Sequence, residues 1–244
     1  MRARNRTLLG LLAILGLSLA AVSVVPADDA KPEKKGTNTQ EAAKDAKATA
    51  ETKAIQDLEL ADRLIRYGRQ EKNAESLLLA AQILQKTATQ QLKSERKATG
   101  DVEKTKSPKM MDNSPKGLLA EAKKMSSTPQ VEALAMATEK ILDETTRGAA
   151  RGPQVDNFTI FSLQTVTWNP ISFRAGEFAD VYISTGSFSN MILEVTDENG
   201  NLVARDSAPG NYYRCSWTPR WTGSFRIRLV NNNTLAFNCR LTTN

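Results

Sequence analysis

Apolar residues recur every three or four positions in the first half of the chain, which is the spacing of one helix face. One stripe comprises Ile55, Leu58, Ala61, Leu64 and Ile65, and a second comprises Ala74, Leu77, Leu78, Ala81 and Leu84. Asn73 is placed to cap the second helix. Because Gly68 and the polar residues after it separate the stripes, we expect an antiparallel helical hairpin.

A second pair of helices is predicted further along. The segment 93–116 is rich in Lys, Ser, Thr and Glu and has no periodicity, so it is predicted to be a flexible insertion. Thr128 and Pro129 supply a cap and a first-turn proline for the last helix. The helical region thus spans 55–147, either as a tetratricopeptide-like repeat or as a small four-helix unit. The stripes of the second pair are Leu118, Leu119, Ala122 and Met125, then Val131, Leu134, Ala135, Thr138, Ile141 and Leu142.

The pattern changes after residue 152, where short apolar runs alternate with turn residues. This spacing predicts a β-sandwich over 152–244, with Asn199 and Gly200 forming a hairpin turn. The chain is therefore expected to be an α + β protein of two parts. The predicted strands are Phe158–Leu163, Ile171–Phe173, Ala179–Ser184, Met191–Thr196, Leu202–Arg205, Tyr212–Trp217, Phe225–Val230 and Leu235–Leu241.

The first 27 residues have the pattern of a signal peptide: three arginines, an uncharged run and small residues before Asp28. Cleavage after Ala27 would send the protein to the periplasm or outside the cell. The alternative is a leader retained as a membrane anchor, since the uncharged run is nearly long enough to span a bilayer. Residues 28–54 have almost no large apolar side chain and are predicted to be a flexible tether.

Composition excludes several functions. The chain has no histidine, which rules out Ser-His-Asp and Cys-His catalysis and every histidine-bearing metal site. Its formal charge of +6 includes the three arginines of the leader, and from residue 152 onward the positive and negative residues balance. Because nucleic-acid binding needs a concentrated basic face, we expect no nucleic-acid partner.

Export affects the interpretation of Cys215 and Cys239. Strand alternation turns both side chains inward, and two cysteines in an oxidising compartment are more often paired than free. A disulfide is the first prediction. Two buried free thiols on non-adjacent strands are the alternative, because a disulfide requires closely spaced Cα atoms.

The last ninety or so residues contain five motifs in a fixed order: Phe173-Arg-Ala-Gly-Glu177, Val181-Tyr-Ile-Ser, Val195 to Asp206, Trp217-Thr-Pro219 and Gly223 to Asn231. In their order and spacing these motifs resemble the bacterial pre-peptidase C-terminal domain. The resemblance implies a jelly-roll-like sandwich that is not itself catalytic and acts in attachment, secretion or maturation. Some members bind calcium through acids in this domain. Here Asn190-Met-Ile-Leu193 replaces the acidic pattern, so no cofactor is expected and calcium is disfavoured.

Arg226, Arg228 and Arg240, with Trp221, are predicted to form a candidate binding face on the last strands. If the last two strands formed a hairpin, Arg226 would lie opposite Arg240, and Arg228 opposite Asn238. Like charges would then need an acidic neighbour such as Glu194, or an acidic partner. Trp221 either stacks on a sugar ring or covers the end of the sandwich.

The sequence thus favours a non-catalytic exported protein that binds an envelope or extracellular protein or polysaccharide, with no membrane contact after signal cleavage. Alternatives are an accessory or maturation partner of a secreted hydrolase, a passive structural spacer, and an enzyme using acids such as Glu132, Glu139 or Asp143. A concave pocket with converging carboxylates would favour the enzyme. A flat sheet with clustered arginines and exposed aromatic rings would favour binding.

Overall fold

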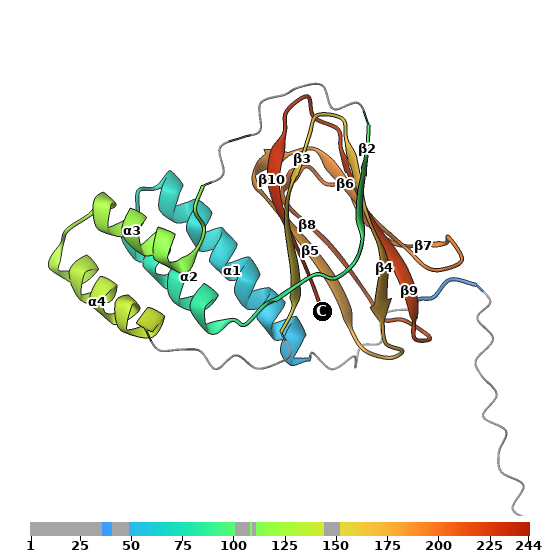
Figure 1. Ribbon diagram of the computed structural model, residues 1–244, viewed down its shortest axis with the longest axis horizontal. Coiled ribbons are helices and arrows are strands. Elements are labelled where there is room, and N and C mark those ends of the chain that lie inside the picture. Colours follow the sequence, from blue (N-terminus) through green and yellow to red (C-terminus); the bar gives the residue numbers. More distant parts are fainter. Residues whose placement is uncertain (1–35, 41–48, 101–107, 109–110, 144–151) are drawn as a thin grey trace, which may run out of the picture. The chain divides into compact units, whose positions relative to one another are not determined.

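Figure 1 shows the computed structural model of the chain, which describes residues 36–40, 49–100, 108, 111–143 and 152–244. The predicted signal peptide 1–27 lies outside these ranges. Four helices precede two β-sheets, so the expected α + β architecture with a sandwich is confirmed. None of the described helices is both long and apolar enough to span a membrane.

The four helices are α1 (Ala50–Gln70), α2 (Ala74–Lys86), α3 (Pro115–Met125) and α4 (Pro129–Asp143). The predicted caps are present: the Asn73 side chain accepts a hydrogen bond from the backbone N–H of Ser76 at 2.8 Å, and Thr128 Oγ1 accepts one from Val131 at 3.4 Å. Helix α2 contacts each of the other three helices. Their shared core is made of the predicted stripes, with Leu77, Leu78 and Leu118 fully buried.

The sandwich consists of eight main strands whose positions agree with the predicted runs. Strands β5 (Ala179–Ser189), β6 (Met191–Thr196) and β7 (Leu202–Asp206) begin at the predicted residues. Asn199 and Gly200 form the turn between β6 and β7, with Gly200 at a φ of 85°. The other strands are β3 (Gln154–Ile160), β4 (Thr165–Phe173), β8 (Gly210–Trp217), β9 (Gly223–Asn231) and β10 (Phe237–Thr243).

The strand order is that of a jelly roll. One sheet has the order β1-β3-β10-β5-β8 and the other β2-β4-β9-β6-β7, where β1 (Gln90–Gln91) and β2 (Arg96–Thr99) are short edge strands. Consecutive main strands lie in different sheets, except for β6 and β7, which are neighbours in one sheet. The inward-facing aromatic rings meet edge-on between the sheets, as Phe173 does with Trp217 at 4.8 Å between ring centroids.

Two segments predicted to be flexible contain ordered structure. Strand β2 lies within 93–116 and pairs with β4, although all four of its side chains are exposed. Backbone pairing with β4 and the ion pair between Arg96 and Asp156 place it at the sheet edge, and no apolar pattern marks it. Helix α1 begins at Ala50, and Asn38 is fully buried, although both residues fall within the predicted tether 28–54.

Candidate functional site

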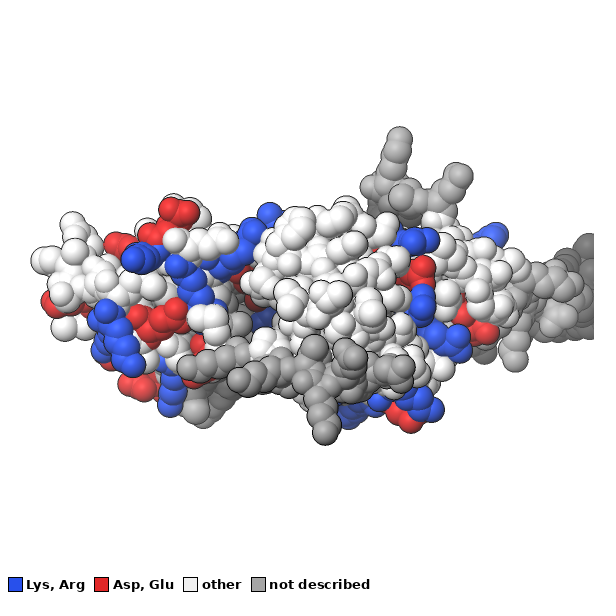
Figure 2. Space-filling model, turned by 90° about the horizontal axis from the view of Figure 1, so that it is seen from above, with Lys and Arg blue, Asp and Glu red and all other residues white. Residues whose placement is uncertain are grey.

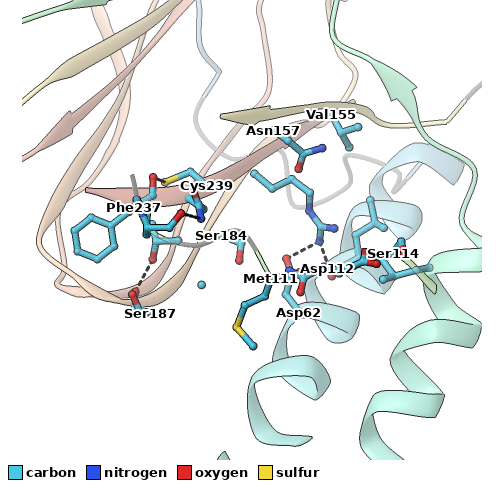
Figure 3. Close-up of a pocket in the computed structure, with 18 of the residues that line it drawn as sticks. Asp62, Met111, Asp112, Ser114, Val155, Asn157, Ser184, Ser187, Phe237 and Cys239 are labelled. Carbon is cyan, nitrogen blue, oxygen red and sulfur yellow. Dashed lines mark hydrogen bonds and ion pairs between the residues drawn. The ribbon is translucent and has the colours of Figure 1, made fainter. Parts of the chain in front are cut away.

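A cavity of about 830 Å³ lies between the helices and the first sheet (Figure 3). One wall comes from α1, the C-terminal end of α2 and the residues that lead into α3. The other comes from β3, β5 and β10. This volume is within the range of sites for small molecules. The cavity is therefore the candidate functional site.

The cavity includes a buried ion pair that also joins α1 to the sheet. Arg240 of β10 contacts Asp62 of α1 at 2.6 Å, and the two side chains are 17% and 7% exposed. Tyr182 donates a hydrogen bond to the same carboxylate at 3.3 Å. Burial raises the pKa of Asp62, while Arg240 and the hydrogen bonds act in the opposite direction. All these contacts fix the carboxylate in place.

A second carboxylate lies at the start of α3. Asp112 accepts a hydrogen bond from the backbone N–H of Ser114 at 2.8 Å, and Ser114 caps the helix by accepting from Gly117. These bonds from Ser114 lower the pKa of Asp112. Gly117 is needed here because a Cβ atom would collide with the Asp112 carboxylate. Arg69 extends this wall by pairing with Glu121 at 2.8 Å.

Polar groups that make no protein hydrogen bond line the sheet side of the cavity. Strand β5 is irregular between Ser184 and Ser189, which presents the exposed Ser187 to the cavity. Asn157 projects from β3 on the same side (Figure 3). Within the described part of the chain, the Asn157 amide and the Ser187 hydroxyl have no hydrogen-bond partner. They are free to bind a ligand.

The charged side chains among the described residues that line the cavity are Asp62, Asp112, Arg69 and Arg240, two of each sign. Both arginines are already ion-paired. Met111 and Val155 add apolar surface to the lining. The arrangement suits a neutral ligand with both hydroxyl and apolar surfaces.

The predicted face of Arg226, Arg228 and Arg240 does not exist, because β9 and β10 belong to different sheets. Arg226 and Arg228 are exposed on β9, and Arg228 pairs with Glu194 at 2.8 Å, which confirms Glu194 as the acidic neighbour. Arg240 instead joins the candidate cavity. On the face shown in Figure 2, positive and negative side chains are mixed over the helices.

Trp221 covers the end of the sandwich. It is 4% exposed, and its indole N–H donates to Glu198 at 2.7 Å. The ring is therefore unavailable for stacking on a sugar.

The predicted disulfide is absent: Cys215 and Cys239 are free and buried. Strand β5 lies between β8 and β10, so the two cysteines are at least two strand spacings apart, about 10 Å. The register adds an offset, because Cys215 faces Val181 and Val181 faces Thr243 rather than Cys239. A disulfide requires Cα atoms within about 7 Å.

Both thiols are expected to be unreactive in the folded protein. Burial raises the pKa of Cys215 to about 12 and raises that of Cys239 further. Electrophoretic mobility should therefore be the same with and without reductant, and both thiols should react with Ellman's reagent only after denaturation. A mobility shift on reduction, or fewer than two thiols in denaturant, would contradict this arrangement.

The acids proposed for an enzyme lie outside the cavity. Glu132 and Asp143 are exposed on α4, and the partly exposed Glu139 of the same helix pairs with Lys123 of α3. No group of three or more acidic or cysteine side chains that could hold a metal ion occurs among the described residues. The acids that do line the cavity, Asp62 and Asp112, were missed. Asp62 could have been noticed, since it lies four positions after Leu58 on the apolar face of its helix.

Comparisons with known proteins assign no family. No protein-family model matches the chain, and no curated protein matches it. Among solved structures, the Yersinia pseudotuberculosis-derived mitogen is 15% identical over 37% of this chain and 85% of its own, with a TM-score of 0.26. Cobalt(II) HppE in complex with Tris buffer is 9% identical over 77% of this chain and 98% of its own, with a TM-score of 0.19. These TM-scores are too low to support an argument from similarity.

Proposed function

We propose that the chain is a non-catalytic binding protein whose cavity takes a neutral, hydroxyl-rich ligand such as a short oligosaccharide. The observation that carries the proposal is a cavity whose described charged residues balance and whose described wall presents two polar groups without a hydrogen-bond partner, Asn157 and Ser187. Asn157 of β3 and Ser187 at the end of β5 lie on either side of β10, so they would bind different hydroxyl groups of one extended ligand. A sugar hydroxyl both donates and accepts hydrogen bonds, and an amide and a hydroxyl group can each do the same.

The contacts of the Asp62 and Asp112 carboxylates support ligand binding without catalysis. Glycoside hydrolysis needs one carboxyl group to protonate the leaving oxygen and another to act as base or nucleophile. The Asp62 carboxylate is nearly enclosed and held by Arg240 and Tyr182. Asp112 is tied to the start of α3 through Ser114. Both carboxylates are thus committed to positioning the walls.

The place of action follows from the sequence features. The basic and uncharged leader supports a role in the periplasm or outside the cell. The resemblance of the sandwich to the pre-peptidase C-terminal domain supports attachment to an extracellular or envelope polysaccharide. We therefore propose that the ligand is part of such a polysaccharide.

Calorimetric titration tests this proposal with neutral oligosaccharides of glucose, xylose and N-acetylglucosamine, and with oligogalacturonate as an acidic comparator. At least one neutral sugar should bind, and the double substitution Asn157→Ala, Ser187→Ala should weaken it tenfold or more, about 1.4 kcal/mol. Asn232→Ala is the matched control, because Asn232 is exposed in the β9–β10 loop, outside the cavity.

The same samples separate binding from catalysis. Chromatography after prolonged incubation should recover the sugar uncut. The proposal is wrong if no neutral oligosaccharide binds, or if the double variant binds as the wild type does. If the sugar is cleaved, the cavity is still the ligand site, but the protein is an enzyme and not a binding protein.

A further inference from the structure

A short N-terminal segment, residues 36–40, lies in a slot at one end of the sandwich. The slot is formed by Asp197 and Glu198 of the β6–β7 turn, and by Thr218, Trp221 and Gly223 around the β8–β9 turn. It lies apart from the cavity, since the two share no lining residue. The segment therefore marks a second, independent feature.

Asn38 is the anchor of this segment. Its side-chain Oδ1 accepts hydrogen bonds from the backbone N–H groups of Arg220 at 2.9 Å and Trp221 at 3.1 Å. Its Nδ2 donates to the Trp221 carbonyl at 3.0 Å and to Glu198 at 3.4 Å. The side chain is fully buried, and both ends of its amide are satisfied. Only an amide side chain of this length offers that set of donors and acceptors.

The backbone of the segment is bent at Asn38, where the Thr39 N–H donates to the Thr37 carbonyl at 2.9 Å. The Asn38 N–H donates to Asp197 at 2.9 Å, and the Gln40 N–H donates to the Thr218 carbonyl at 2.9 Å. At the other end, the Asn201 side chain donates to the Gly36 carbonyl at 3.1 Å. The bend points the Asn38 side chain into the slot, and main-chain bonds hold the segment on both sides of it.

The slot is shaped for this occupant at Gly223. A Cβ atom on Gly223 would lie 2.7 Å from Glu198 and 2.9 Å from Nδ2 of Asn38. The glycine thus leaves the space that the amide and its acidic partner fill. Gly210, at the start of β8, shows the contrast, because nothing lies closer than 3.8 Å to a Cβ placed there.

We infer that the slot is a recognition site for a short bent peptide with a central asparagine, and that residues 36–40 of the same chain are its resident ligand. The N-terminal segment is then a docked peptide joined to α1 by residues 41–48. Because its contacts are local and self-contained, it should remain bound at micromolar concentration once the covalent connection is cut.

The test places a recognition site for a sequence-specific protease within residues 41–48 of the full chain. After cleavage, the N-terminal fragment should remain with the rest of the protein on size exclusion at micromolar concentration. Asn38→Ala should weaken its retention about a hundredfold, since four side-chain hydrogen bonds are lost. Gly223→Ala should release the fragment as well, without any change in the peptide.

Thr39→Ala and Gly210→Ala are the matched controls and should retain the fragment. Circular dichroism of each uncut variant shows whether the sandwich is folded. Release of the wild-type fragment, or equal retention in Asn38→Ala and Gly223→Ala, would overturn the inference. A dimer in the uncut wild type that disappears in Asn38→Ala would also overturn it, because the segment would then occupy the slot of a second copy.

Discussion

Replacing Arg240 with methionine is expected to lower the free energy of unfolding at pH 7 by about 3–5 kcal/mol. The substitution keeps most of the apolar stem but leaves the Asp62 carboxylate, which is 7% exposed, without its counter-ion. The Tyr182 hydroxyl remains as a donor, but it carries no charge. An unpaired buried charge is among the most costly changes a folded protein can undergo.

The loss should shrink as the pH falls. Burial raises the pKa of Asp62 in the folded state, and without Arg240 nothing opposes that rise with a positive charge. Between the unfolded pKa and this higher folded pKa, the folded state binds more protons than the unfolded state, so stability increases as the pH decreases. Urea unfolding of the variant and wild type at pH 7 and pH 5 measures both effects.

Arg226→Met is the control for this prediction. Arg226 is exposed on the other sheet, and no ion pair to it occurs among the described residues, so its replacement should change the stability by less than about 0.5 kcal/mol. Equal losses in the two variants would contradict the role of the buried pair. So would a deficit in Arg240→Met that grows toward pH 5.

Replacing Trp168 with alanine is expected to cost about 3–5 kcal/mol through the cavity it leaves. Trp168 is fully buried on β4 and meets Phe158 edge-on at 4.9 Å between ring centroids. Its indole N–H donates to Asp156 at 2.8 Å, and Asp156 also pairs with Arg96 of β2. The substitution thus empties the core and removes one hydrogen bond from the carboxylate that β2 contacts.

This variant also tests how the helices depend on the sandwich. Helix α1 is bound to the first sheet by Asp62–Arg240 and by Glu59–Arg214 at 3.0 Å. Helical circular dichroism and tryptophan fluorescence should therefore report one shared transition, shifted to lower urea in Trp168→Ala. Trp168→Phe should shift it less, because most of the apolar volume remains. A helical transition that does not move would show that the helices fold independently.

The helices and strands that could be predicted from the sequence are those set by the local pattern of apolar and polar side chains. The stripes of α1 and α2 and the cap at Asn73 follow from local periodicity, and so do the eight strand runs. Alternation also placed Cys215 and Cys239 correctly in the interior. These features depend on neighbours within a few positions along the chain.

Strand partners could not be predicted in the same way. Alternation shows which face of a strand is buried, but not which strand lies beside it, so β9 and β10 were paired although they lie in different sheets. The disulfide and the arginine face both failed for this reason. Strand β2 and Asn38 were missed because backbone hydrogen bonds and polar side-chain contacts hold them, and neither kind of contact leaves an apolar pattern in the sequence.

The jelly-roll order also has a consequence for when the protein can fold. The last strand, β10, is central in its sheet and pairs with both β3 and β5, so that Phe237 lies beside Ile160. Such pairings between distant parts of a chain form slowly. The first sheet cannot close until β10 has left the ribosome. Until then β3 and β5 lack the strand that lies between them, and their apolar faces cannot be fully buried.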